Sequence, residues 1–241
     1  MTTFATIAGV TMRALLGRRR TLLMVLLAGT PVLLGLLVRA NDAELDNIGP
    51  TIDGFVVRIV LPVVALVFGT AALGSELDDG TAIHILTKPI GRWTIVLAKT
   101  AIAGTLTATL VVPSTVVAGF LLGGFDPDNV GVTFAFALAN LVGSFLYVAI
   151  FLVLSVVTSR GLIIGLAYSL IWEGLLSGLL PGTQIFSVRE YIGGIAEALA
   201  PGAVADSIIG AGGFLYAAFA LLIAVVLGSV RLATYEIRGT D

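Results

Sequence analysis

The sequence predicts an all-α, polytopic membrane protein with six transmembrane helices and both termini in the cytoplasm. Three observations predict this class: the chain of 241 residues is 58% hydrophobic and 12% charged, long apolar runs recur along it, and Lys and Arg gather in alternate loops. Soluble domains are about half apolar and about a quarter charged, so a mean hydropathy of +1.08 excludes an ordinary soluble domain. We therefore expect a multi-pass protein of the cell (plasma) membrane.

The first 20 residues predict a helix that lies on the membrane surface. Apolar side chains recur at near-helical spacing from Phe4 to Leu15, and arginines follow at positions 13 and 18–20. A fraying N-terminal tail is the alternative. A cleaved secretory signal is less consistent with the sequence, because the next apolar run exceeds the usual signal core and further spans follow it.

Six apolar runs are long enough to cross a bilayer, whose core of about 30 Å needs about 20 helical residues. The third and fourth runs exceed one perpendicular crossing, so we expect tilt, or a kink at Pro113 in the third. The longest stretch outside them is too short for an independent domain, so residues 1–241 form a single transmembrane domain. The predicted spans are residues 21–38, 55–74, 95–122, 132–158, 162–180 and 214–230.

The positive-inside rule gives the orientation. With the N-terminus in the cytoplasm, ten of the 13 Lys and Arg residues lie on the cytoplasmic side, and only Arg39, Arg58 and Arg189 lie outside. The net charge of -2 leaves no basic surplus for a nucleic-acid backbone, so no nucleic acid is expected as a partner. The absence of cysteine excludes disulfides, thiolate metal sites and Cys nucleophiles.

The cytoplasmic loop of residues 76–92 predicts a short helix. Gly80 permits a turn, Thr81 can cap the helix and Pro89 ends it. Ile83, Leu86 and Ile90 would then form an apolar edge that faces the bilayer or another protein. His84 lies in this loop, but its spacing to nearby acids matches no metal-ligand motif, so we expect no metal site.

Residues 181–213 form the extracellular or re-entrant segment. Two short helices are predicted there, Val188–Leu199 and Ala203–Ile209, separated by a Pro-Gly pair. They either fold on the outer surface or dip into the outer leaflet where protein buries their ends.

A stripe of small or polar residues runs along the fifth predicted span at every fourth position, and such stripes let helices pack closely in lipid. Glu173 on this stripe is the one carboxylate deep in any predicted span. An ion pair with Arg58 and a place on a transport route are equally open interpretations. The hydroxyls of the third span either line a route or bond back to their own helix. The residues of the stripe are Gly165, Ser169, Glu173 and Ser177, with Trp172 beside it.

No set of residues predicts catalysis or cofactor binding. A glycine-rich loop that ends in Gly-Lys-Ser/Thr is absent, so nucleotide phosphates have no such cradle in this chain. Glu173 alone supplies neither a nucleophile with its base nor a metal set. We therefore expect a chain that is not an enzyme and that binds no cofactor.

The loop motifs together resemble the permease subunit of type-2 ATP-binding cassette (ABC-2) transporters. The resemblance covers essentially the whole chain. Its most specific part is Glu76, then Asp79-Gly80-Thr81, then Pro89, Ile90 and Arg92 ahead of a helix with Lys99. Further similar positions are Tyr168, Trp172, Glu173, Pro181, Ser187 and Tyr191.

The resemblance implies the type V exporter-like fold, with residues 81–88 as a coupling helix that docks on a separate ATPase. Two copies of that ATPase would bind ATP and Mg, and a second permease would complete a homodimer or a heterodimer near the fifth span. It also implies that export is the usual activity and that the outer segment contains paired re-entrant helices. The implied coupling residues are Glu76, Asp79, Gly80, Thr81, Ile83, Leu86, Lys88, Pro89 and Arg92, and the dimer or translocation-path candidates are Gly165, Ser169, Trp172, Glu173 and Ser177.

Two other classes stay open. An ATP-independent secondary transporter or channel would move its substrate without an ATPase and often contains an internal repeat, and this sequence has no convincing one. A structural membrane subunit would show neither ATPase coupling nor flux.

Overall fold

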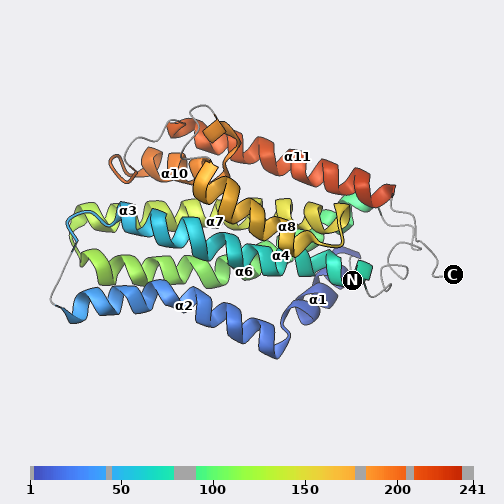
Figure 1. Cartoon of the computed structure of the whole chain (residues 1–241), viewed down its shortest axis with the longest axis horizontal. Helices are drawn as coiled ribbons and strands as arrows, with labels where there is room; N and C mark the ends of the chain where they lie inside the picture. Colours follow the sequence, from blue (N-terminus) through green and yellow to red (C-terminus); the bar gives the residue numbers. More distant parts are fainter. Residues whose placement is uncertain (1–2, 42–44, 79–90, 177–182, 205–208, 235–241) are drawn as a thin grey trace.

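The computed structural model describes residues 3–41, 45–78, 91–176, 183–204 and 209–234, and every regular element among them is helical (Figure 1). The long apolar sequence runs form these helices because a backbone in lipid must satisfy its hydrogen bonds within its own segment. The elements are α1 (Thr3–Leu15), α2 (Arg18–Ala40), α3 (Gly49–Ile52), η1 (Asp53–Val60), α4 (Leu61–Asp78), α6 (Arg92–Gly123), α7 (Pro127–Val157), α8 (Gly161–Ala167), η2 (Tyr168–Leu176), η3 (Thr183–Phe186), α10 (Val188–Leu199), η4 (Gly210–Gly212) and α11 (Gly213–Ala233).

Five helices in the described residues are long and apolar enough to cross a membrane, which confirms the polytopic class. The fifth predicted span, residues 162–180, corresponds to α8 and η2, whose apolar part of Gly161–Gly174 is shorter. Part of that span lies outside the described residues, so a total of six spans stays a prediction, as does the orientation. The five spans are Arg19–Ala40, Gly49–Gly74, Arg92–Gly123, Pro127–Val157 and Gly210–Ala233.

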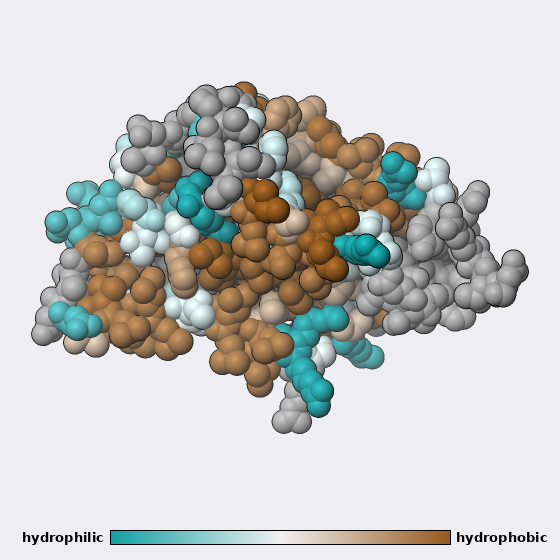
Figure 2. Space-filling view, viewed as in Figure 1, coloured by the Kyte–Doolittle hydropathy of each residue, from teal (hydrophilic) through white to brown (hydrophobic). Residues whose placement is uncertain are grey.

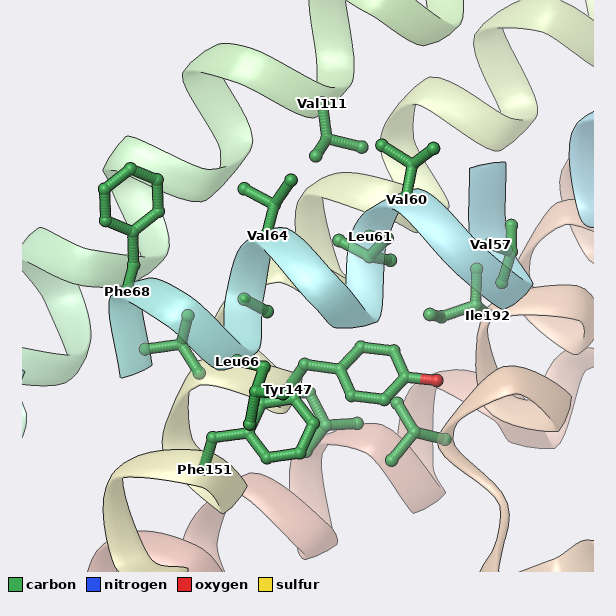
Figure 3. Packing of buried hydrophobic residues seen from close by; sticks show 14 of the residues in the cluster. Val57, Val60, Leu61, Val64, Leu66, Phe68, Val111, Tyr147, Phe151 and Ile192 are labelled. Atoms are coloured by element: carbon green, nitrogen blue, oxygen red, sulfur yellow. The ribbon is translucent and has the colours of Figure 1, made fainter. Parts of the chain in front are cut away.

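The helix α7 is central to the bundle and packs against α4, α6, α8, α10 and α11. The span that contains η1 and α4 is the most buried of the five, because 72% of an apolar stretch of 18 residues within it lies inside the protein. A helix that is apolar on all sides is expected to be surrounded in this way. In Figure 3, Val60 and Val64 of this span point towards Val111 of α6, and Leu66, on the other side of the helix, lies near Tyr147 and Phe151 of α7.

The helices α2 and α11 lie on opposite sides of the bundle (Figure 1). In each of these two spans only 22% of an apolar stretch of 18 residues is buried. Their outward faces carry fully apolar side chains such as Leu37 and Leu215, which are 63% and 77% exposed. Apolar residues dominate the face in Figure 2, with hydrophilic residues mainly towards the helix ends. This surface suits contact with lipid chains or with another membrane protein.

The N-terminal segment forms the predicted helix over Thr3–Leu15, so the alternative of a fraying tail does not apply to it. Leu15 is 1% exposed and belongs to the apolar core, and α1 packs against α6 and α4. One face of α1 therefore rests on the bundle itself. Its position relative to the bilayer surface stays a prediction.

Of the two helices predicted in the outer segment, α10 has the expected bounds of Val188–Leu199. Residues 205–208 of the second predicted helix lie outside the described residues, as do residues 79–90, which contain the predicted coupling helix. The two helices that flank residues 79–90 are described: α4 ends at Asp78 and α6 begins at Arg92.

Candidate functional site

Glu173 forms the centre of a buried polar cluster. Its side chain projects from η2 and the residue is 1% exposed. The carboxyl group accepts hydrogen bonds from the hydroxyl of Tyr168 at 2.8 Å, from the backbone N–H of Val188 at 3.0 Å and from the hydroxyl of Tyr147. Buried polar groups are stable only with such partners, so three elements are tied together at this carboxyl group.

The π-helical geometry of η2 positions Tyr168 against Glu173. The two residues are five apart, and a π-helix closes its hydrogen bonds over five residues, so both side chains lie on one face. In an α-helix this separation would turn them well apart. The ring of Tyr147 stacks on Phe151 with centroids 5.8 Å apart, and Phe151 meets Tyr168 edge to face, which holds both phenols in place.

The third partner of Glu173 is the N-terminus of α10. The first N–H groups of a helix have no acceptor within the helix and carry a partial positive charge. Ser187 precedes this helix but its side chain makes no capping hydrogen bond. Glu173 takes that role from a distant part of the chain, because it accepts from the N–H of Val188.

A charged pair lies one residue beyond this cap. Arg189 of α10 donates from Nε to Asp53 Oδ1 at 3.3 Å and forms a second, parallel hydrogen bond from its terminal nitrogen to Asp53 Oδ2. The two side chains are 16% and 10% exposed. The pair joins α10 to η1, so α10 is anchored to two different spans by polar bonds.

The ion pair predicted between Glu173 and Arg58 is not formed. Among the described residues no hydrogen bond or ion pair joins them, and Glu173 is satisfied by the two tyrosines and the N-terminus of α10 instead. Arg58 lies near Glu190 of α10 and acts on it electrostatically. Depth in the membrane alone pairs Glu173 with Arg58, whereas hydroxyl and backbone donors can satisfy a buried carboxyl group equally well.

The small-residue stripe of the fifth predicted span packs inside the chain. Gly165, Ser169 and Glu173 are all buried, and Trp172 is half-buried. A Cβ on Gly165 would lie 2.3 Å from Leu66 Cδ1 of α4 and 3.1 Å from Phe151 Cδ1 of α7. The stripe thus brings this helix close to two helices of the same chain. Ser177 lies outside the described residues.

A second buried polar site lies at the other end of α4. Lys99 of α6 is fully buried, and its Nζ donates to Glu76 Oε1 at 2.7 Å and to the carbonyl oxygen of Ala72 at 2.6 Å. The side chain of Glu76 is 16% exposed, so the pair reaches from the interior almost to the surface. It joins the last turns of α4 to the first turns of α6.

The hydroxyls of α6 mostly bond back to their own helix, as one of the two interpretations expected. Thr105, Thr107 and Thr115 donate to carbonyl oxygens four residues earlier, and Thr109 to one three residues earlier. Ser114 instead donates to the carbonyl oxygen of Ala28 in α2. These hydroxyls therefore satisfy their own protons within α6 or at its contact with α2.

Comparison with protein families matches residues 10–188 to the model described as "ABC-2 family transporter protein". The chain belongs to this family. Comparison with curated proteins gave no match for this chain. The ABC-2 family consists of membrane-embedded permease subunits that work with an ABC ATPase, so this protein is a multi-pass permease of the ABC transporter type.

The matched range of this ABC-2 permease includes both buried polar sites. It begins within α1, passes the Lys99–Glu76 pair and ends at Val188, whose N–H binds Glu173. The sequence places Glu76 and Lys99 within one motif but does not pair them, and no pattern in it points to Tyr147. A lysine in an apolar span is itself a signal, since such residues need an internal partner.

Several predicted coupling residues of this ABC-2 permease lie outside the described residues, and only Glu76 and Arg92 of that set are described. No group of three or more His, Cys, Asp and Glu side chains able to hold a metal ion occurs in the described part of the chain. The undescribed members are Asp79, Gly80, Thr81, Ile83, Leu86, Lys88 and Pro89.

Proposed function

We propose that this ABC-2 permease is the transmembrane subunit of an ATP-driven exporter and that a separate ATPase, which binds ATP and Mg, docks on residues 81–88. The observation that carries the proposal is the buried Lys99–Glu76 pair, which joins the two helices that lead into and out of the proposed docking loop. A force on that loop reaches both helices together, because breaking a buried ion pair is costly.

The packing offers a continuous route from the docking loop to the outer end. The helices α4 and α6 both pack on α7, and α7 carries Tyr147, which donates to Glu173. Glu173 in turn binds the N-terminus of α10. Movement of α4 and α6 is thus proposed to change the position of α10 and of Glu173, which would lie beside the translocation path.

We further propose two ATPase copies and a second permease, as a homodimer with both termini in the cytoplasm. The stripe of Gly165, Ser169 and Glu173 is buried within one chain, so the opposite face of this helix is the surface left for contact. That face carries Ile163, Leu170 and Ile171, which are 65%, 58% and 55% exposed. An apolar face of this kind suits a second permease within the bilayer.

Purification of the C-terminally tagged chain from its own host, in mild detergent, tests the proposal. An ATPase present in about equal amount by mass spectrometry supports it, and Leu86→Asp should abolish the complex without changing membrane insertion. Thr87→Asp is the control, because it adds the same charge beside the predicted apolar edge. Reproducible absence of an ATPase from the folded protein would instead favour an ATP-independent transporter or a structural subunit.

A further inference from the structure

A polar cavity lies at the end of the bundle where α2 begins and α4 ends. It has a volume of about 220 Å³ and lies between α2, α4, the end of α7 and the start of α8. Pockets for drug-sized ligands are about 300 to 1,000 Å³, so this cavity suits a smaller chemical group. Its polar lining includes Arg20, Thr70, Ser155, Thr158 and Ser159.

The charge of the cavity is positive. Arg20 is the charged residue in its lining, and no carboxylate contributes to it. The guanidinium of Arg20 takes part in no hydrogen bond or ion pair within the described residues. A guanidinium has five N–H donors and no acceptor, so it favours a group rich in negatively charged oxygen atoms.

The hydroxyls of the cavity divide into two kinds. Thr70 and Ser155 donate their protons to carbonyl oxygens of their own helices, at 2.7 Å in both cases. Thr158 Oγ1 accepts from the N–H of Arg160 at 3.2 Å, which leaves its own proton free to donate, and Ser159 is exposed. The cavity lining therefore offers a guanidinium from α2 and two hydroxyl donors from the turn between α7 and α8.

The lining of the cavity also has an exposed apolar residue. Leu162 belongs to the lining and is 51% exposed. A headgroup that enters the cavity would leave its acyl chain beside Leu162. Basic pockets between transmembrane helices are known to take anionic headgroups.

We infer that this cavity binds a phosphate group through Arg20, Thr158 and Ser159. The phosphate belongs either to the headgroup of an anionic phospholipid or to a small soluble phosphate. The inference requires only the fold of this chain, so it holds whether or not an ATPase docks on residues 81–88.

The test measures thermal unfolding of the purified full-length chain in detergent as a function of added ligand. The probes are phosphatidylglycerol, phosphatidylcholine and soluble glycerol phosphate. We expect phosphatidylglycerol to raise Tm more than phosphatidylcholine does, since a ligand that binds the folded state stabilises it. A comparable rise with glycerol phosphate would identify a soluble phosphate as the source, and no rise with it would identify the lipid.

Arg20→Gln and Arg19→Gln form a matched pair, because Arg19 is exposed and does not line the cavity. We expect Arg20→Gln to weaken apparent phosphate affinity by about tenfold or more, the loss of a charge-assisted hydrogen bond, and Arg19→Gln to bind like the wild type. Should Arg20→Gln fail to fold, Thr158→Val removes one donor at nearly constant volume and should weaken binding as well. Equal responses to the two lipids together with no response to glycerol phosphate, or unchanged affinity in both cavity variants, would overturn the inference.

Discussion

The carboxyl group of Glu173 accepts a hydrogen bond from the backbone N–H of Val188, 15 residues further along the chain, at 3.0 Å. A side chain of one apolar helix thus caps the first turn of another. The bond satisfies a backbone donor of α10, a short amphipathic helix whose N-terminal N–H groups are costly to leave unpaired in an apolar setting. Glu173 is therefore a structural anchor of α10 as well as a candidate for the translocation path.

Replacement of Glu173 tests this anchor. Glu173→Leu leaves two tyrosine hydroxyls and one N–H without their acceptor, and each such buried group costs about 1 to 3 kcal/mol. We expect the free energy of unfolding to fall by about 3 kcal/mol or more for Glu173→Leu. For Glu173→Gln we expect about 1 kcal/mol, because the amide oxygen still accepts. Thermal or denaturant unfolding in detergent measures both.

A double-mutant cycle with Tyr168→Phe serves as the control. Residues within one hydrogen-bond network show interaction energies of about 0.5 to 3 kcal/mol. The losses of Glu173→Leu and Tyr168→Phe should therefore not add, since both remove the same 2.8 Å bond. Additive losses would show that the tyrosine and the carboxyl group do not depend on one another.

The sequence was a good guide to the helices and a poor guide to the site. Apolar runs predicted six spans, and the described residues contain helices long and apolar enough to cross a membrane at five of them. Turn signals predicted α10 at its observed bounds. Both features depend on local pattern and on satisfaction of the backbone. The observed helices extend beyond the predicted spans: the run predicted as residues 55–74 forms one span from Gly49. Helix ends depend on capping and packing, which hydropathy does not report.

The partners of Glu173 lay beyond sequence reasoning. Tyr147 lies 26 residues away on α7, and only the packing of α7 against η2 makes it a neighbour. The π-helical spacing that places Tyr168 beside Glu173 has no signal in the hydrophobic pattern. Depth in the membrane alone suggested Arg58, yet depth does not say which way a side chain faces around its helix.

Gly165 lies where its helix packs closely against α4 and α7, with no room for a larger side chain. A Cβ there would overlap Leu66 Cδ1 at 2.3 Å, so Gly165→Ala should destabilise the protein by about 1 to 3 kcal/mol through overpacking. Gly131 in α7 is the matched control, because a Cβ there would have no atom within 4 Å. Gly131→Ala should be neutral or stabilising by up to about 1 kcal/mol, since alanine favours the helix. Comparable unfolding midpoints for the two variants would contradict this account.

The predicted orientation can be tested with single cysteines, because the chain has none of its own. Asp126 lies in the turn between α6 and α7, and Ser159 in the turn between α7 and α8; both are exposed. With both termini in the cytoplasm, Asp126→Cys should react with a membrane-impermeant maleimide added to intact cells. Ser159→Cys should react only after the membrane is opened. The reverse pattern would invert the topology.

The unequal burial of Lys99 and Glu76 predicts unequal losses of stability when each residue is replaced. Lys99 is fully buried, whereas the side chain of Glu76 is 16% exposed. Glu76→Leu leaves a buried ammonium group with the carbonyl of Ala72, and loss of one partner of a buried pair costs about 3 to 5 kcal/mol. Lys99→Met leaves a carboxylate near water. We therefore expect the free energy of unfolding to fall less than half as far for Lys99→Met as for Glu76→Leu.

The double variant Lys99→Met/Glu76→Leu should regain most of the stability, because apolar groups of similar volume can replace a buried ion pair at little cost. This variant separates the two roles of the pair. If the ion pair itself, and not only the contact between α4 and α6, transmits the movement of the docking loop, the double variant will fold and bind its ATPase yet lose substrate-stimulated ATP hydrolysis. Retained stimulation would show that apolar packing between α4 and α6 is sufficient for coupling.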